Sequence, residues 1–337
     1  MKASMSRTAS KFSDFNLAQP LARALADAGY ETPTPIQAQS IPLVMQGHDL
    51  LGVAQTGTGK TASFALPTLH HIFSRERDTP KRGCRALVLA PTRELAAQIA
   101  ESFKTYGAHM AVDVEVIFGG VSIQRQIKRV VAGNDVVVAT PGRLLDLIER
   151  KVLSLKDVEI LILDEADQMM DMGFIHSLRK IAALVPKERQ TLFFSATMPP
   201  KIRTLAGQFL TNPKKVAVAP ESTTAERVTQ SVIMVNQAEK QALLTLTLSN
   251  PSIDRALVFT RTKHGADRVV KRLWRAGIDS VAIHGNKSQG QRKRALDAFK
   301  DGKVKIMIAT DVAARGIDID GISHVINFEL PNVAEQY

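Results

Sequence analysis

The stretch EILILDEADQMMDMGF, residues 159–174, joins a run of apolar side chains directly to a group of carboxylates. The apolar run at 160–163 predicts a strand that is buried on both faces. Asp164, Glu165 and Asp167 follow it at once. Carboxylates this close together repel one another and resist the loss of water, so we expect a cation beside them. The alternative is an acidic turn that stays in solvent.

Length and composition favour a globular protein of two domains. The chain has 337 residues, of which 45% are hydrophobic and 23% charged. No apolar run is long enough to predict a membrane span. The start, MKASMSRTASK, lacks the apolar core of a secretory signal, and we expect a short disordered basic tail over 1–11, with a transit peptide as the alternative.

The charge balance points to a polyanionic partner. The net charge is +11, which favours a polyanionic partner such as nucleic acid, with generic basic character as the alternative. With only one Trp and three Tyr, extensive base stacking is not expected, so contact with the sugar-phosphate backbone is the natural mode. The single Cys84 excludes an internal disulfide and a multi-cysteine metal site, and it suits a reducing compartment such as the cytoplasm.

Short β-rich runs alternate with amphipathic helical patterns along the chain. This alternation is typical of βαβ units, and it predicts parallel sheets covered by helices on both faces. The expected strands of the first half are 49–55, 85–91, 112–118, 135–140, 159–164 and 191–197, and those of the second half are 255–262, 279–285, 303–311 and 324–329. Residues 93–109 and 175–185 have helical patterns.

The βα pattern stops at NPKKVAVAPESTTAERVTQ, residues 212–230. This stretch has prolines, small polar residues and no helical period, so it predicts a linker over 218–227. The predicted domains are therefore 12–217 and 228–337. In both, the polar motifs follow expected strands, and ligands of open α/β sheets bind beyond the carboxyl ends of the strands.

The motif AQTGTGKT, residues 54–61, fits a phosphate-binding loop, with Ala54 where glycine is commonest. Gly57 and Gly59 permit a turn whose backbone N–H groups face phosphate oxygens, and the helix that follows adds its positive end. Lys60 can reach the β- and γ-phosphates, and the hydroxyl of Thr61 suits Mg²⁺.

This loop supplies the cation that the acidic stretch requires. Asp164 is placed to hold the Mg²⁺ shell, and Glu165 is a candidate to orient or deprotonate the attacking water. Asp167 would connect the site to its neighbours. Together the two motifs predict an enzyme that hydrolyses a nucleoside triphosphate, with Lys60, Asp164 and Glu165 as catalytic residues.

Ten short motifs occur in one order: GYETPTPIQ (29–37), AQTGTGKT, PTRELAAQ (91–98), GG (119–120), TPGR (140–143), DEAD (164–167), SAT (195–197), VFTRT (258–262), QGQR (289–292) and ATDVAARGID (309–318). This series closely resembles that of the DEAD-box RNA helicases of superfamily 2. The general character and spacing of the motifs are similar to those of the bacterial RhlE-like group. The resemblance implies two tandem RecA-like domains, ATP and Mg²⁺ as cofactors, RNA as partner and RNA-stimulated ATP hydrolysis by a cytoplasmic monomer.

The resemblance also implies roles for individual residues. Gln37 matches the glutamine that reads the adenine edge, Tyr30 the aromatic that stacks on adenine, Phe12 the upstream aromatic and Asp318 the carboxylate that reaches the ribose. The ATP-binding set is completed by Gln55, Thr56, Gly57, Thr58, Gly59, Lys60 and Thr61. The alternative for Gln37 is an ordinary surface glutamine.

The RNA-binding and coupling residues follow in the same way. RNA contacts are implied for Arg93, Gly119, Gly120, Thr140, Gly142, Arg143, Arg261, Thr262, Gly285, Thr310 and Gly316. Coupling between nucleotide and RNA is implied for Asp167, Ser195, Thr197, Gln289, Arg292 and Arg315. The alternatives are structural ion pairs for Arg93 and Arg315, and helix capping for Ser195 and Thr197.

The sequence departs from the family pattern after LPNVAEQY, which ends at Tyr337. The arginine-rich element HRxGRxGR is expected beyond this point, so we expect the chain as given to bind ATP but to hydrolyse it weakly, with an incomplete second domain. Three other functions stay open on the sequence alone. They are a nucleotide-gated RNA clamp, a DNA translocase, and a phosphate-loop enzyme acting on small molecules.

Overall fold

The computed structural model describes residues 11–55, 57–75, 77–218, 228–311, 319 and 321–330. The chain divides into two units, Met1–Arg227 and Val228–Tyr337. Residues 1–10 of the expected tail (1–11) and residues 219–227 of the expected linker (218–227) lie outside the described residues.

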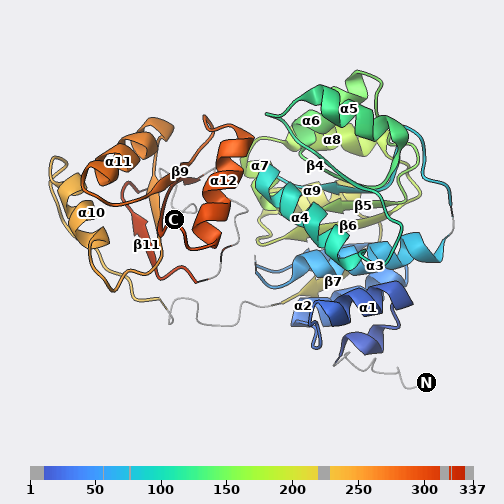
Figure 1. The fold of residues 1–337 in the computed structure, drawn as a ribbon. Coiled ribbons are helices and arrows are strands. Elements are labelled where there is room, and N and C mark those ends of the chain that lie inside the picture. Colours follow the sequence, from blue (N-terminus) through green and yellow to red (C-terminus); the bar gives the residue numbers. More distant parts are fainter. Residues whose placement is uncertain are drawn as a thin grey trace. The chain divides into compact units, whose positions relative to one another are not determined.

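The first unit is built on a parallel sheet of seven strands in the order β3-β4-β2-β5-β6-β1-β7 (Figure 1). The strands are β1 (Leu50–Val53), β2 (Cys84–Leu89), β3 (Val114–Ile117), β4 (Asn134–Ala139), β5 (Ile160–Leu163), β6 (Gln190–Ser195) and β7 (Lys214–Ala217). Before and between them lie η1 (Phe12–Phe15), α1 (Gln19–Asp27), α2 (Pro35–Met45), α3 (Lys60–Ser74), α4 (Arg93–Tyr106), α5 (Ile123–Ala132), α6 (Pro141–Glu149), α7 (Ala166–Asp171), α8 (Ile175–Leu184) and α9 (Pro200–Phe209).

Side chains alternate between the two faces of this sheet. Ala86 and Val88 of β2 join a core that α1–α4 cover, whereas Leu87 and Leu89 join a second core that α5–α9 cover. The two cores explain why β5 is apolar without interruption, and they confirm the expected parallel sheet with helices on both faces.

One strand of the first unit was not predicted. Residues 214–217 form β7, which pairs with β1 at the edge of the sheet, although the sequence indicated only a break in the pattern there. In β7 only Val216 is buried, and Lys214 and Lys215 are exposed. An edge strand with one buried side chain has no apolar run by which it could be recognised.

The second unit contains a smaller parallel sheet in the order β11-β8-β10-β9. Its elements are α10 (Lys240–Leu248), β8 (Ala256–Thr260), α11 (Lys263–Arg275), β9 (Val281–Ile283), α12 (Gln289–Lys300), β10 (Ile306–Thr310) and β11 (His324–Asn327). Helices α10 and α11 pack on one face, and Phe299 of α12 lies in the core of the other face.

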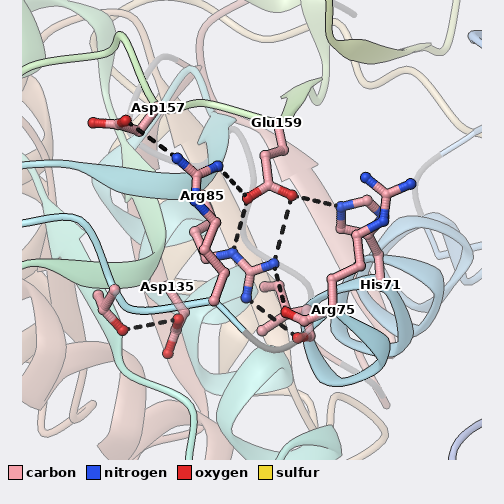
Figure 2. Close-up of polar contacts among 9 residues, drawn as sticks. His71, Arg75, Arg85, Asp135, Asp157 and Glu159 are labelled. Carbon is pink, nitrogen blue, oxygen red and sulfur yellow. Dashed lines mark hydrogen bonds and ion pairs between the residues drawn. The ribbon is translucent and has the colours of Figure 1, made fainter.

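A cluster of charged side chains joins the first unit's helix α3 to the beginning of β2 and β5 (Figure 2). Buried Arg85 donates from Nε to Glu159 over 2.9 Å, and from Nη1 and Nη2 to the carbonyls of Ile72 and Arg75. His71 Nε2 lies 2.8 Å from the other oxygen of Glu159. Burial raises the pKa of Glu159, but the hydrogen bonds from His71 and Arg85 outweigh it and hold this pKa at about 2. The cluster therefore anchors the carboxyl end of α3, whose opposite end carries the glycine-rich loop.

Candidate nucleotide and nucleic-acid site

The glycine-rich loop leaves β1 and turns directly into α3. The N–H of Ala54 donates to the carbonyl of Ser195, which fixes the start of the loop against β6. Gly57 and Gly59 have φ values of +82° and +88°, a region that favours glycine, and α3 begins at Lys60. The sequence predicted this strand–loop–helix arrangement, and it aims the positive end of α3 at the loop.

Lys60 and Asp164 lie at the same edge of the sheet. Their strands, β1 and β5, are parallel and flank β6, so both residues follow carboxyl ends. Burial raises the pKa of the Asp164 carboxyl, and the charge of Lys60 and the N–H of Glu165 oppose this shift. The Nζ of Lys60 is buried and has no hydrogen-bond partner among the described residues. A buried ammonium without a partner, facing a buried carboxylate, fits a bound phosphate and its metal.

The DEAD and SAT motifs are joined by hydrogen bonds. Oδ2 of Asp167 accepts from the N–H of Thr197 over 2.9 Å and from its Oγ1 over 3.0 Å. Ser195 donates from Oγ to the carbonyl of Thr197 over 2.8 Å, and its own carbonyl accepts from Ala54. The end of β6 is therefore tied both to the acidic motif and to the glycine-rich loop. Glu165, only 2% exposed, lies between Asp164 and Asp167 with a φ of +51°.

Gln37 is held against the glycine-rich loop. It is 3% exposed, donates from Nε2 to the carbonyl of Gly59 over 3.1 Å, and accepts at Oε1 from the N–H of Thr34. The hydroxyl of Thr34 donates to the carbonyl of Thr58 over 2.8 Å, and Thr58 in turn donates to Gln55. The sequence analysis predicted no role for Thr34, although Thr34 and Gln37 have the spacing of a capping box.

The predicted aromatic residues form a small cluster beside this loop. The ring of Tyr30 meets those of Phe12 and Tyr106 edge to face, each at 5.9 Å between centroids. Phe12 is buried in the first core, whereas Tyr30 is 40% exposed. Burial, together with the hydrogen bond to Tyr30, raises the pKa of the Tyr106 phenol. Tyr30 therefore has ring surface left for a ligand, and Phe12 supports it.

Three predicted RNA residues gather beyond β2 and β3. Arg93 begins α4, and its guanidinium lies against Gly119 and Gly120. A Cβ placed on Gly120 would come within 2.6 Å of the Arg93 Cζ, and Gly120 has a φ of +79°. The positive φ favours glycine at this position, and a side chain there would displace the Arg93 guanidinium.

The TPGR residues lie beyond β4, which is between β3 and β2 in the sheet. Thr140 donates its N–H to Ile117 and precedes α6, while a Cβ on Gly142 would meet open space. Arg143 donates from Nη1 to Oε1 of Gln126 over 3.0 Å, and buried Gln126 donates to the carbonyl of Phe118. Gln126 thus fixes the glycine pair relative to TPGR, and no pattern in the sequence pointed to it.

The second unit places its predicted residues at the carboxyl ends of three strands. Arg261 and Thr262 follow β8, Gly285 follows β9 and Thr310 ends β10. Arg261 donates to the carbonyl of Leu330 over 3.1 Å, and Thr262 caps α11. Gln289 and Arg292 lie in the first turns of α12. Thr56, Arg315, Gly316 and Asp318 lie outside the described residues.

Two family profiles match the chain. DEAD/DEAH box helicase matches residues 34–205, and the helicase conserved C-terminal domain matches residues 238–337. The chain belongs to the DEAD-box helicase family. It is 45% identical over 327 residues to the DEAD-box ATP-dependent RNA helicase CshA of Streptococcus pneumoniae, covering 97% of this chain and 62% of that protein. It is 44% identical to the RNA helicase CrhR of Synechocystis, covering 97% of this chain and 66% of that one.

Solved structures of DEAD-box proteins have the same fold. Saccharomyces cerevisiae Dbp5 bound to RNA and ADP BeF3 superposes with a TM-score of 0.79 at 30% identity, covering 97% of this chain and 82% of Dbp5. A DEAD box protein from Methanococcus jannaschii has a TM-score of 0.58 at 38% identity, covering 97% and 87% of the two chains. The expectation of two RecA-like domains is confirmed. The chain spans about three fifths of the length of its curated relative CshA.

Two features are absent from the described part of the chain. None of its helices has the length and apolar character needed to cross a membrane. The same residues contain no group of three or more His, Cys, Asp or Glu side chains that would hold a metal ion. The predicted Mg²⁺ site uses two protein residues, Thr61 and Asp164, so phosphate oxygens and water would complete its shell.

Proposed function

We propose that this chain is the ATP-driven core of an RNA helicase, which binds RNA through its sugar-phosphate backbone and opens short duplexes locally. The observation that carries this proposal is that Lys60 and Asp164 lie at one sheet edge. The Lys60 ammonium is buried there without a hydrogen-bond partner among the described residues, and its charge acts on the Asp164 carboxyl. Magnesium and ATP would supply the phosphoanhydride bond and the charge that complements these two groups. We also propose a cytoplasmic monomer, with domains at 12–217 and 228–337.

The predicted catalytic, metal-binding and coupling residues of the first unit each have a task in this scheme. Lys60 contacts the β- and γ-phosphates, and Thr61 and Asp164 hold the metal. Glu165 orients the attacking water and accepts its proton. Asp167 communicates the state of the phosphate to β6 through its two hydrogen bonds with Thr197.

RNA would bind along the other half of the same edge. Arg93, Arg143 and the glycines that flank them offer cations and bare backbone, groups that suit phosphate and ribose rather than base edges. Contacts to the ribose 2′-hydroxyl would distinguish RNA from DNA. The second unit would add Arg261, Thr262, Gly285, Thr310 and Gly316 to the same strand, with Gln289, Arg292 and Arg315 as coupling residues and Asp318 on the ribose of ATP. The RhlE-like subgroup stays a prediction, because the relatives described above are named CshA and CrhR.

Steady-state ATP hydrolysis with and without RNA tests the proposal, in the wild type and in Glu165→Gln. The variant keeps the shape of the side chain but loses the base, so we expect turnover to fall by about 100-fold or more while ATP binding is retained. Glu188→Gln, a change at an exposed carboxylate at the opposite edge of the sheet, is the matched control. Equal turnover in wild type and Glu165→Gln, or equal stimulation by DNA and RNA, would contradict the proposal.

A further inference from the structure

Helix α11 of the second unit presents a row of basic side chains to solvent. His264, Arg268, Lys271 and Arg275 are exposed and are spaced by four, three and four residues, which places them on one face of the helix. The opposite side of α11 is buried in the core through Ala266, Val269 and Leu273. The row extends about 16 Å along the helix axis.

These cations are not neutralised by their surroundings. Arg268, Lys271, Arg272 and Arg275 have no hydrogen bond or ion pair through their side chains to any of the residues that the structure describes. The one acid on α11, Asp267, is engaged with Lys287 at 2.7 Å and with His284 at 3.0 Å. The positive charge of this face is therefore available to a ligand.

The only tryptophan of the chain lies beside this row. Trp274 follows Lys271 by three residues on the same helix and is 71% exposed. Tryptophan is usually well buried, and leaving so large an apolar ring in water is unfavourable unless something covers it. An exposed ring among cations is the combination by which proteins hold single-stranded nucleic acid, where bases stack and phosphates pair.

A groove runs along the other side of the row. It has a volume of about 600 Å³, and its lining includes Thr245 and Leu246 of α10, Ser249 directly after α10, and Arg272 and Arg275 of α11. None of its lining residues is a carboxylate. Leu246 is 72% exposed but is the only large apolar side chain of this lining, which is too little apolar surface to anchor an amphipathic protein helix.

We propose that this surface, which we call the α11 face (Arg268, Lys271, Arg272, Trp274 and Arg275), is a second contact site for single-stranded RNA. The inference rests on the proposed function, because Thr262, one of the predicted RNA residues, caps the start of α11, so the helix continues directly from the RNA-binding edge. An RNA strand that is too long for that edge continues along α11. Its phosphates contact the cations of the α11 face, and one of its bases stacks on Trp274. An acidic protein segment is the competing occupant.

Trp274 provides its own assay, since it is the only source of tryptophan fluorescence. Oligouridylates of about 6 and about 20 nucleotides are titrated against the protein, with binding followed by anisotropy and stacking by quenching of Trp274. We expect the long strand to quench and the short strand to bind with little quenching. Trp274→Ala should weaken only the long strand, by about 5- to 100-fold, and Trp274→Phe should restore most of its affinity.

The charged residues are tested by salt dependence. R268Q/K271Q/R275Q removes three phosphate contacts, so the slope of log affinity against log salt for the long strand should fall by about 2. The control K180Q/K187Q/K201Q removes the same charge from exposed positions of the first unit and should leave the slope nearly unchanged.

Each result of these titrations decides the matter. If both strands bind and stimulate ATP hydrolysis but Trp274 is not quenched and its variants bind like the wild type, the α11 face is not an RNA site, and the proposed function stands. If polyglutamate quenches Trp274 and RNA does not, the face belongs to an acidic protein and the inference is overturned. If neither strand binds at low salt, the proposed function fails with it.

Discussion

Replacing Glu159 with glutamine removes the carboxylate around which the charged cluster of the first unit is organised (Figure 2). Its pKa is held at about 2, against an ordinary value of 4.5, because His71 and Arg85 donate to it despite burial. A shift of this size corresponds to roughly 3 kcal/mol at neutral pH. The Glu159 side chain is 17% exposed and that of its partner Arg77 50%, so screening by solvent reduces this to about 1–3 kcal/mol.

The substitution also leaves Arg85 without its counter-ion. The Arg85 side chain is 3% exposed, and a buried charge that loses its partner is costly. We therefore expect Glu159→Gln to lower the free energy of unfolding of the first unit by about 2–4 kcal/mol at pH 7. The affinity for ATP should be unchanged, because Glu159 precedes β5 whereas Asp164 follows it.

The pH dependence has a definite sign. A carboxylate whose pKa is lowered in the folded state stabilises the protein above its unfolded pKa of 4.5, and this contribution is lost as the pH falls towards 2. The difference between wild type and Glu159→Gln should therefore shrink by about 1 kcal/mol between pH 7 and pH 3.5.

Urea titration, combined with hydrogen exchange of peptides from α3 and β2, measures this effect in the first unit. Trp274 lies in the second unit and does not report it. Glu188→Gln is the matched control. Glu188 is an exposed carboxylate, and it lines the same cavity of about 690 Å³ as Glu159. If both variants unfold at the same urea concentration at pH 7, or if the difference grows as the pH falls, the reasoning about this cluster is wrong.

Two further substitutions test the loop and the coupling contact. Gly59→Ala would place a Cβ close to Nε2 of Gln37 at a φ of +88°, so ATP affinity, measured with a fluorescent analogue, should fall by tenfold or more, whereas Gly57→Ala meets no neighbour and should cost less. Asp167→Asn weakens the two bonds to Thr197, so RNA-stimulated turnover should fall by about tenfold with ATP binding retained; loss of ATP binding instead would contradict a coupling role.

Much of the fold could be predicted because its signals are local. Apolar runs such as 160–163 and 136–139 predicted strands of a parallel sheet, and β5 and β4 include these positions. The glycine-rich loop and the DEAD motif were recognisable for the same reason, since each carries its chemistry within a few consecutive residues. Strand β7 was missed because an edge strand with one buried side chain leaves no such signal.

The sequence by itself determined which residues are chemically active and that they follow strands, because side-chain type and continuous apolar runs are written in neighbouring positions. Only the tertiary structure decided that β6 lies between β1 and β5, and so that the charge of Lys60 acts on the Asp164 carboxyl. The same holds for Gln37 against Gly59 and for Gln126 between Phe118 and Arg143. Parallel strands pair across long connections, and the side chains that meet there share no local pattern, so their contacts exist only once the sheet has formed.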